Sequence, residues 1–531
     1  DILADWLHAE LKQLKNNNRS YASKDEYLEC KIKEECNNKE TKVITDWLYA
    51  ELIFLNKSDN IKFPIINNTS TIHQVKASEI NKKDEEGLTL LHLAAKKGNL
   101  AKILVLLDKG ANIEAKNKKE WTPLHIAAHE GHQTAIQVLL DKGADIEAKT
   151  QRSSTPLRLS VLNGQLAAIQ VLLDKGADIE AKTQFDNTAL HLAAQQGNLE
   201  IIKVLLDKGA NLEVKDNKDA TPLYLAAQKG HLAVMQALLD QEANIEAKDN
   251  IGRTLLHMAA DNDHLEAIQA LIAKGANLKA KTKNGWTPLH RAAYNGHTAA
   301  IQALVDQGAN IEEKDNDGYT PLHLAAESGH TVAIQALVDK GANIEANDND
   351  GYTPLHVAAE SGHAADIQAL VDKGANLEAK DNNDDTPLHV AAQNGHTVAI
   401  QALVDKGANI EARNNDGGTP LHWAAYIGHT AAIQTLLDKG SNIEAEDNDG
   451  YTSLHWAVYN GHLEVVQTLL AKEADIEAKD EDSWTLIHWA VQESQEAILQ
   501  ALVAKGANIE IRDEDGWNPL HVASQEGHLG V

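Results

Sequence analysis

Small and apolar side chains recur along this chain in a pattern that repeats every 33 residues. In the stretch 317–349, which is typical, the apolar positions fall into two groups with the three- and four-residue spacing of helix faces. The first group is Leu322, Ala325 and Ala326, and the second is Ile334, Leu337 and Val338. The pattern therefore predicts two short helices in each repeat, each with one apolar face.

Polar residues and glycines mark the ends of these helices. Thr320 is suited to cap the first helix, and Pro321 fits its first turn, where a missing N–H costs nothing. Gly329 is expected to end the first helix. Gly341 is expected to end the second helix in a left-handed conformation, which glycine adopts without steric cost.

A tetrad similar to Thr-Pro-Leu-His recurs at one place in every repeat and sets the number of repeats. It starts at Thr89, Thr122, Thr155, Thr188, Thr221, Thr254, Thr287, Thr320, Thr353, Thr386, Thr419, Thr452, Thr485 and Asn518, which makes 14 repeats without an insertion. One repeat has too little apolar surface to fold alone, but stacked repeats bury a continuous core. We expect an all-α solenoid over residues 76–531, whose last repeat lacks its second helix.

Residues 1–75 do not follow this repeat and carry a duplication of their own. The related segments Asp5–Leu11 and Asp46–Leu52 lie 41 residues apart, and each belongs to an amphipathic helical pattern. We expect a small helical N-terminal domain or cap that covers the apolar end of the first repeat, because a solenoid needs such a cap.

Four motifs together resemble one repeat family. Thr-Pro-Leu-His, Ala-Ala, Gly-His and Gly-Ala-Asn-Ile-Glu-Ala recur at the 33-residue period, and from about Asn81 to Val531 the chain is similar to ankyrin repeats. The resemblance implies two antiparallel helices and a hairpin finger in each repeat. It also implies partner proteins bound on a concave face, and a tetrad histidine that hydrogen-bonds its own threonine and neighbouring backbone.

Composition and motifs narrow the classes of function. The net charge of −29 disfavours nucleic acid and anionic membranes as partners. No run of apolar residues is long enough to span a bilayer, and Cys30 and Cys36 are too few for a disulfide framework. No phosphate loop, His-Glu-x-x-His or Gly-x-Ser-x-Gly motif occurs. We therefore expect no enzymatic activity, no cofactor and no metal site.

Aromatic residues gather at the positions that should face the groove. The residue after the tetrad and the residue three further on share a helix face, and this pair is unusual at Trp423 and Tyr426, Trp456 and Tyr459, Trp489, and Arg291 and Tyr294. The finger position before the tetrad is aromatic at Trp121, Trp286, Tyr319, Tyr352, Tyr451, Trp484 and Trp517. Since Trp and Tyr dominate interface hot spots, these residues, apart from Trp121 and Trp286, are the candidate partner-binding site.

Two interpretations of these rings remain open, because they can also pack between first helices and only stiffen the stack. Glutamates recur on the return arm of the fingers as solvated charge, with Lys279 as the exception. They are Glu114, Glu147, Glu180, Glu213, Glu246, Glu312, Glu345, Glu378, Glu411, Glu444 and Glu477. An aromatic floor with an acidic rim predicts a partner segment that combines apolar residues with Lys or Arg.

Two irregular joints lack both helix-ending glycines. Glu242 and Asp263 replace them at one joint and Glu473 and Ser494 at the other, 231 residues or seven repeats later. We infer the duplication of a seven-repeat block, with joints that are softer or that change the superhelix angle. The alternative is neutral drift copied with the block.

The sequence as a whole predicts a protein–protein interaction scaffold in the cytoplasm that binds a partner segment along its groove, with oligomeric state open. The near-identical repeats and the Asn-, Lys- and Ile-rich N-terminus resemble large ankyrin effector proteins of intracellular bacteria, which act on host proteins in the host cytosol. One alternative is the targeting arm of a toxin or effector with an enzymatic domain beyond residue 531. Two others are a mechanical element, as in a membrane channel, and a self-associating protein.

Overall fold

The computed structural model describes residues 77–528, where the secondary structure is helical apart from three isolated antiparallel bridges. The expected all-α repeat fold is confirmed. The helical domain predicted for residues 1–75 lies outside the described residues. The chain divides after Asn217 into an N-terminal and a C-terminal part, which are described separately.

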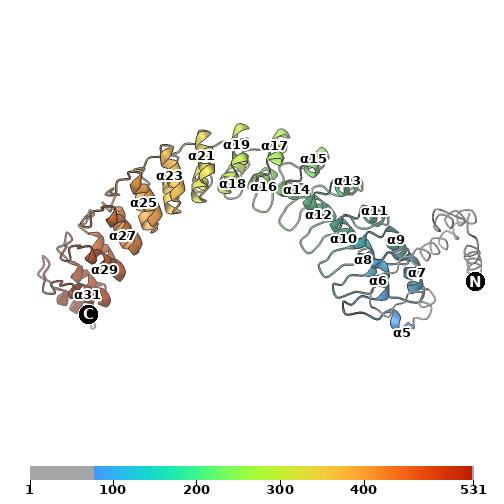
Figure 1. The fold of residues 1–531 in the computed structure, drawn as a ribbon, viewed down its shortest axis with the longest axis horizontal. Helices are drawn as coiled ribbons and strands as arrows, with labels where there is room; N and C mark the ends of the chain where they lie inside the picture. The colour runs from blue at the N-terminus through green and yellow to red at the C-terminus, as the bar shows by residue number, and fades with distance from the viewer. Residues whose placement is uncertain (1–76, 529–531) are drawn as a thin grey trace, which may run out of the picture. The chain divides into compact units, whose positions relative to one another are not determined.

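The N-terminal part contains a short helix followed by four helix pairs (Figure 1). The helices are α5 (Ala77–Ile80), α6 (Leu90–Lys96), α7 (Leu100–Asp108), α8 (Pro123–Glu130), α9 (Gln133–Asp141), α10 (Pro156–Leu162), α11 (Leu166–Asp174), α12 (Ala189–Gln196) and α13 (Leu199–Asp207). In each pair the first helix begins directly after the threonine of the tetrad.

The C-terminal part continues the same alternation. Its helices are α14 (Pro222–Lys229), α15 (Leu232–Asp240), α16 (Leu255–Asp261), α17 (Leu265–Ala273), α18 (Pro288–Tyr294), α19 (Thr298–Asp306), α20 (Pro321–Glu327), α21 (Thr331–Asp339), α22 (Pro354–Glu360), α23 (Ala364–Asp372), α24 (Pro387–Gln393), α25 (Thr397–Asp405), α26 (Pro420–Ile427), α27 (Thr430–Asp438), α28 (Ser453–Tyr459), α29 (Leu463–Ala471), α30 (Leu486–Gln492), α31 (Glu496–Ala504) and α32 (Pro519–Glu526).

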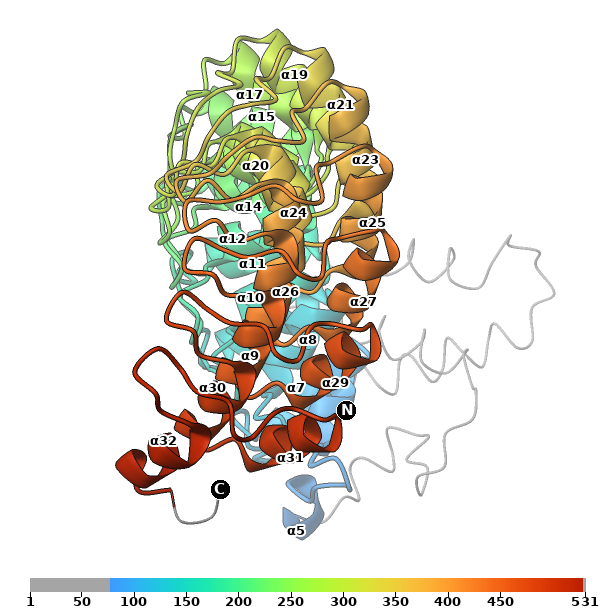
Figure 2. The same cartoon turned by 90° about the vertical axis from the view of Figure 1, so that its left-hand side faces the viewer.

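Within each part the helices form two rows. In the C-terminal part, α20, α24 and α26 lie in the row of first helices, and α21, α23, α25 and α27 lie in the row of second helices (Figure 2). The two helices of a repeat pack on each other, and helices of the same row pack on their counterparts in the adjoining repeats of the same part. The predicted inner positions Leu322, Ala325 and Ile334 are fully buried. The core is therefore continuous along each row.

The tetrad joins each first helix to the next finger. His323 Nδ1 accepts the backbone N–H of Thr320 at 3.1 Å, and His323 Nε2 lies 2.9 Å from the backbone oxygen of Tyr352 in the next repeat. The expected bonding of the tetrad histidine is thus confirmed. Where Tyr224 replaces the histidine, its hydroxyl donates to Asp249 at 2.7 Å in the next repeat. The tetrad side chain is a structural link between repeats.

The irregular joints hold non-glycine residues in the left-handed region. Gly341 has φ of 93°, whereas Glu242 and Glu473 adopt φ of 64° and 67° at the equivalent positions. Asp263 and Ser494 have φ of 55° and 56°. A side chain in this region costs about 1–2 kcal/mol, so both joints carry local strain. The block duplication and the softness of the joints stay predictions.

Candidate protein-binding surface

Five aromatic side chains of α26, α28 and α30 form a continuous row across three repeats. The ring centroids of Trp423 and Tyr426 lie 5.7 Å apart, and those of Tyr426 and Trp456 lie 5.4 Å apart. Tyr459 extends the row at 6.1 Å from Trp456 and 5.5 Å from Trp489. The structure therefore brings together the five residues of this aromatic row, which the sequence placed on one helix face.

The two positions of each pair differ in exposure. Tyr426 and Tyr459 are 39% and 43% exposed, whereas the three tryptophans are half-buried. In other repeats the tryptophan position holds a buried side chain such as Leu324. Each indole therefore packs partly into the stack and partly supports an exposed tyrosine. The packing interpretation therefore fits the buried part of each indole, and the binding interpretation stays a prediction for the exposed tyrosines.

Aspartates at the tips of the fingers hold the indoles in place. The Nε1 of Trp456 donates to Asp447 at 2.9 Å, and that of Trp489 donates to Asp480 at 2.8 Å. The other carboxylate oxygen of Asp447 accepts the backbone N–H of Tyr451 at 2.9 Å. A ring fixed in this way loses little conformational entropy when a partner binds. Sequence reasoning missed these aspartates, because their only signal is the Asx-turn pattern at the finger tip, which is typical of any turn.

Two finger aromatics join the aromatic row and others do not. Tyr451 lies 5.5 Å from Trp456 and 5.7 Å from Trp489, and Trp484 lies 5.3 Å from Trp489. Trp517 is 39% exposed and its ring contact is with the tetrad histidine of its own repeat. The fingers therefore add two rings to the surface near α28 and α30.

Tyr451, Trp456, Tyr459 and Trp489 surround a hollow of about 220 Å³, together with His455. We call it the four-ring hollow. Burial lowers the pKa of His455 to about 4, so this histidine is neutral at pH 7. The tryptophans of α28 and α30 thus remain within reach of a ligand.

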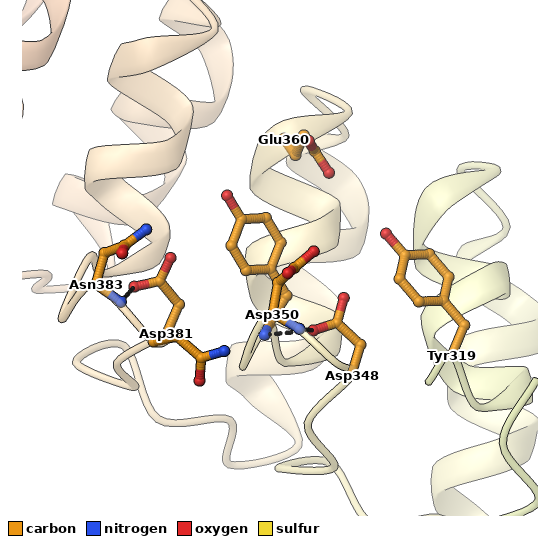
Figure 3. A pocket seen from close by; sticks show the side chains of 8 residues that line it. Tyr319, Asp348, Asp350, Glu360, Asp381 and Asn383 are labelled. Atoms are coloured by element: carbon orange, nitrogen blue, oxygen red, sulfur yellow. Dashed lines mark hydrogen bonds between the residues drawn. The ribbon is translucent and has the colours of Figure 1, made fainter. Parts of the chain in front are cut away.

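A second hollow of about 290 Å³ lies beside the fingers that precede α20 and α22, and Figure 3 shows it. It is lined by Tyr319, Asp348, Asp350, Tyr352, Glu360, Asp381, Asn382 and Asn383. We call it the acidic hollow. Burial raises the pKa of Asp348, Glu360 and Asp381, and neighbouring carboxylates raise the pKa of Glu360 further. The acidic hollow therefore favours a positively charged ligand, which would lower the pKa of these carboxyl groups.

Tyr319 and Tyr352 lie in this acidic hollow and apart from the aromatic row. Each ring stacks on the tetrad histidine of its own repeat, with centroids 5.3 Å apart. Burial raises the pKa of both phenols. The aspartates around them were not singled out from the sequence, because a finger aspartate reads as an ordinary turn residue.

Arg291 and Tyr294 form a separate cluster on α18. The Arg291 guanidinium lies 4.7 Å from the ring centroid of Trp286, and an Arg291 nitrogen lies 3.6 Å from Asp261. The rings of Trp286 and Tyr294 are 5.1 Å apart. The chain itself therefore supplies the cation for this finger ring.

The glutamates of the return arms have a different role from the predicted one. Glu345 Oε1 accepts the backbone N–H of Asn376 in the next repeat at 2.8 Å. The same bond is made by Glu114, Glu147, Glu180, Glu246, Glu312, Glu378, Glu411, Glu444 and Glu477. The interpretation of these residues as merely solvated charge is wrong. They connect repeats, and the acid beside the tyrosines comes from the finger aspartates and Glu360.

Residues 77–528 contain neither a metal-binding cluster nor a membrane-spanning helix. No group of three or more His, Cys, Asp or Glu side chains there is arranged to hold a metal ion. No helix in that range combines the length and the apolar character needed to cross a membrane.

Comparison with known proteins identifies the repeats. A family profile described as ankyrin repeats in three copies matches residues 64–150, 157–249, 248–315, 307–381, 333–414, 368–447, 388–480 and 476–531. A comparison with curated proteins finds no match. Among solved structures, the chain is similar to the ankyrin repeat domain of Bcl-3, described as a unique member of the IkappaB protein family. The sequences are 32% identical over 39% of this chain and 95% of that chain, with a TM-score of 0.37.

Proposed function

The chain belongs to the ankyrin-repeat family, whose domains bind other proteins, and from this premise we propose that it is a scaffold for a segment of a partner protein. The binding surface is the aromatic row of α26, α28 and α30 with the adjoining finger rings. The acidic hollow beside α20 and α22 extends it. The site is one of recognition and not of catalysis.

The observation that carries this proposal is the continuity of the aromatic row. Five rings from three successive repeats touch in sequence, and their tyrosines are exposed. A stack needs no such row, since Leu324 and Val357 fill the tryptophan position of other repeats and are buried there. Rigid aromatic side chains with satisfied polar ends are the usual anchors of protein interfaces.

Charge favours a partner segment that also carries Lys or Arg. The net charge of the chain is −29, and Asp348, Asp350, Glu360 and Asp381 line the acidic hollow. Opposite charges speed encounter and fix the register of a bound segment. We therefore propose a partner segment with apolar residues on the aromatic row and basic residues beside it.

The test compares Tyr459→Ala with a matched control on the second helices. Val398 of α25 is 65% exposed, so Val398→Ala removes an exposed apolar group from a second helix, outside the aromatic row. Proteins captured by the full chain are identified by mass spectrometry, and the affinity of a captured protein is then measured after purification. We expect Tyr459→Ala to weaken binding by at least about 30-fold, the size of a central hot spot, and Val398→Ala to leave it unchanged.

Stability is followed in parallel by urea unfolding. A Tyr459→Ala variant that folds normally and binds its partner as tightly as the unaltered protein would reject the proposal. The charge argument is checked by repeating the measurement from about 0.05 to about 0.5 M salt, where binding should weaken. An affinity that does not depend on salt would contradict the proposal that the partner segment carries Lys or Arg.

The wider role that we propose is that of a host-directed effector of an intracellular bacterium. Near-identical repeats and the Asn-, Lys- and Ile-rich N-terminus support it. A targeting arm for a separate enzymatic domain would use the same surface. The complete reading frame, together with an assay for transfer into host cells, discriminates these roles.

A further inference from the structure

The four-ring hollow is a closed circuit of rings. Tyr451 meets Trp456 at 67°, Trp456 meets Tyr459 at 84°, and Trp489 meets both tyrosines at 77°. Neighbouring centroids are 5.5–6.1 Å apart. Each edge-to-face contact covers one ring face, but the four rings leave between them a hollow of about 220 Å³ that a ligand can enter.

The hydrogen-bonding groups of the indoles are already used. Trp456 and Trp489 donate to Asp447 and Asp480, as described above. Apart from His455, every residue that lines the hollow is aromatic. Recognition in the hollow therefore depends on ring faces, which attract an apolar group or a cation with delocalised charge.

The surrounding charge decides between these two ligands. Burial raises the pKa of Tyr451, and the carboxylates of Asp480, Asp449, Asp482 and Asp447 raise it further, to about 12. His455 contributes no charge at pH 7, since burial lowers its pKa to about 4. A hollow with four carboxylates around it and no cation inside favours a positively charged ligand over a neutral one.

The chain contains an internal precedent for the ligand. Trp286 occupies the same finger position as Tyr451, five repeats earlier, and there the guanidinium of Arg291 lies over the ring with Asp261 beside it. In the later repeat Trp456 stands where Arg291 would be. In that repeat a tryptophan stands in place of the arginine, and the finger ring lines a hollow.

We propose that the four-ring hollow binds the guanidinium of an arginine presented by the partner segment, which lies against ring faces and within the field of the finger aspartates. This inference rests on the proposed function and names one residue of the partner. Arginine fits better than lysine, because its planar guanidinium is weakly hydrated and stacks on aromatic rings. A lysine ammonium would lose its strongly bound water on entering the hollow, because the lining offers few hydrogen-bond acceptors to replace it.

The test uses three short blocked peptides that differ in one residue, namely arginine, lysine or citrulline, with glycine on both sides. Citrulline keeps the shape of arginine but has no charge. Binding to the full chain is followed by tryptophan fluorescence and by the shifts of the indole N–H signals in NMR spectra. We expect weak binding of the arginine peptide, and binding at least about ten-fold weaker for citrulline and lysine.

Two variants locate the binding. Tyr459→Leu removes one ring of the hollow and should abolish the response to the arginine peptide. Tyr294→Leu is the matched control, because Tyr294 is similarly exposed at 40% but lies on α18 outside the hollow. Both variants are checked for folding by urea unfolding. Equal affinity for citrulline, equal affinity for lysine, or an unchanged response in Tyr459→Leu would overturn the inference.

The outcome separates this inference from the scaffold proposal. If Tyr459→Ala no longer binds its protein partner but the unaltered chain does not bind the arginine peptide, the proposed arginine site is wrong. The scaffold proposal is then still supported. If the arginine peptide binds through Tyr459 but partner capture does not depend on that residue, the arginine site stands and the proposed binding surface is wrong.

Discussion

Single positions decide what a repeat displays, and Asp385 is the clearest case. It stands at the finger position that Tyr352 occupies in the preceding repeat, and it is only 5% exposed. Its carboxylate accepts the indole N–H of Trp423 and the side-chain amide of Asn414, both at 2.9 Å. Burial nevertheless raises its pKa to about 6. One buried carboxylate thus anchors the first ring of the aromatic row at an electrostatic cost.

We predict that Asp385→Asn changes how stability depends on pH. The pKa of Asp385 is about 6 in the folded chain and 3.8 as its ordinary value, so the folded state holds the proton more tightly. This group therefore adds stability as pH falls from above 6 to about 3.8. The unaltered protein should gain stability relative to Asp385→Asn between pH 7 and pH 4, as measured by urea unfolding of both. A constant difference across that range would contradict the prediction.

At the scale of the elements, the hairpin fingers hold the repeats together. The backbone N–H of Asn349 donates to Asp317 of the preceding finger at 3.1 Å, and Glu345 reaches forward to the N–H of Asn376. These bonds cross from one repeat to the next, so they are part of the interfaces that make a stack of small modules stable. Lys279 breaks the series, because an ammonium has no oxygen to offer the N–H of Asn310.

We predict that Lys279→Glu stabilises the stack and that the converse change weakens it. The new carboxylate should accept the N–H of Asn310 as Glu246 accepts that of Asn277 at 2.7 Å. The gain should be about 1 kcal/mol, since the bond is charged but exposed. Glu345→Lys should lose a similar amount, and Glu345→Gln, which keeps an acceptor, should lose less. The free energy of unfolding in urea, together with hydrogen exchange at Asn310, checks this order. A Lys279→Glu protein whose free energy of unfolding equals that of the unaltered protein would refute it.

At the scale of the whole chain, the tetrad histidines act together. Burial lowers the pKa of six of them to about 4, namely His125, His257, His323, His356, His389 and His455. Their ordinary pKa is 6.5, so the unfolded state binds more protons between pH 6.5 and pH 4. Stability from these residues is complete above pH 6.5 and is lost as pH falls toward 4.

We predict steep acid unfolding in this window, since each such histidine contributes up to about 1.4 kcal/mol per pH unit. The sign is opposite to that of Asp385 and of Asp348, Glu360 and Asp381, whose pKa burial also raises, but six histidines have a large shift whereas among these four carboxylates only Asp385 does. Helical circular dichroism during an acid titration measures the transition. His323→Asn, which keeps a polar side chain, should make the dependence on pH shallower by about one proton. An unchanged slope would show that other groups cause the acid unfolding.

Much of the fold follows from local patterns in this sequence. These features depend on residues only a few positions apart. They are the helices of each repeat, their threonine caps, the left-handed conformation of Glu242 and Glu473, and the bond between His323 and Thr320. Such contacts depend on short-range geometry, which the spacing of residue types specifies. The grouping of the tryptophans on one face of three first helices also followed from spacing alone.

The contacts that define the candidate site needed the tertiary structure. Asp385 holds Trp423 from 38 residues away, Glu345 reaches Asn376 across 31, and Tyr451 meets Trp489 in the following repeat. Which acceptor an indole finds, and whether a ring closes a hollow or fills it, depends on side-chain rotamers and on how repeats pack. A period in the sequence states that positions are equivalent, but only packing decides which of them touch.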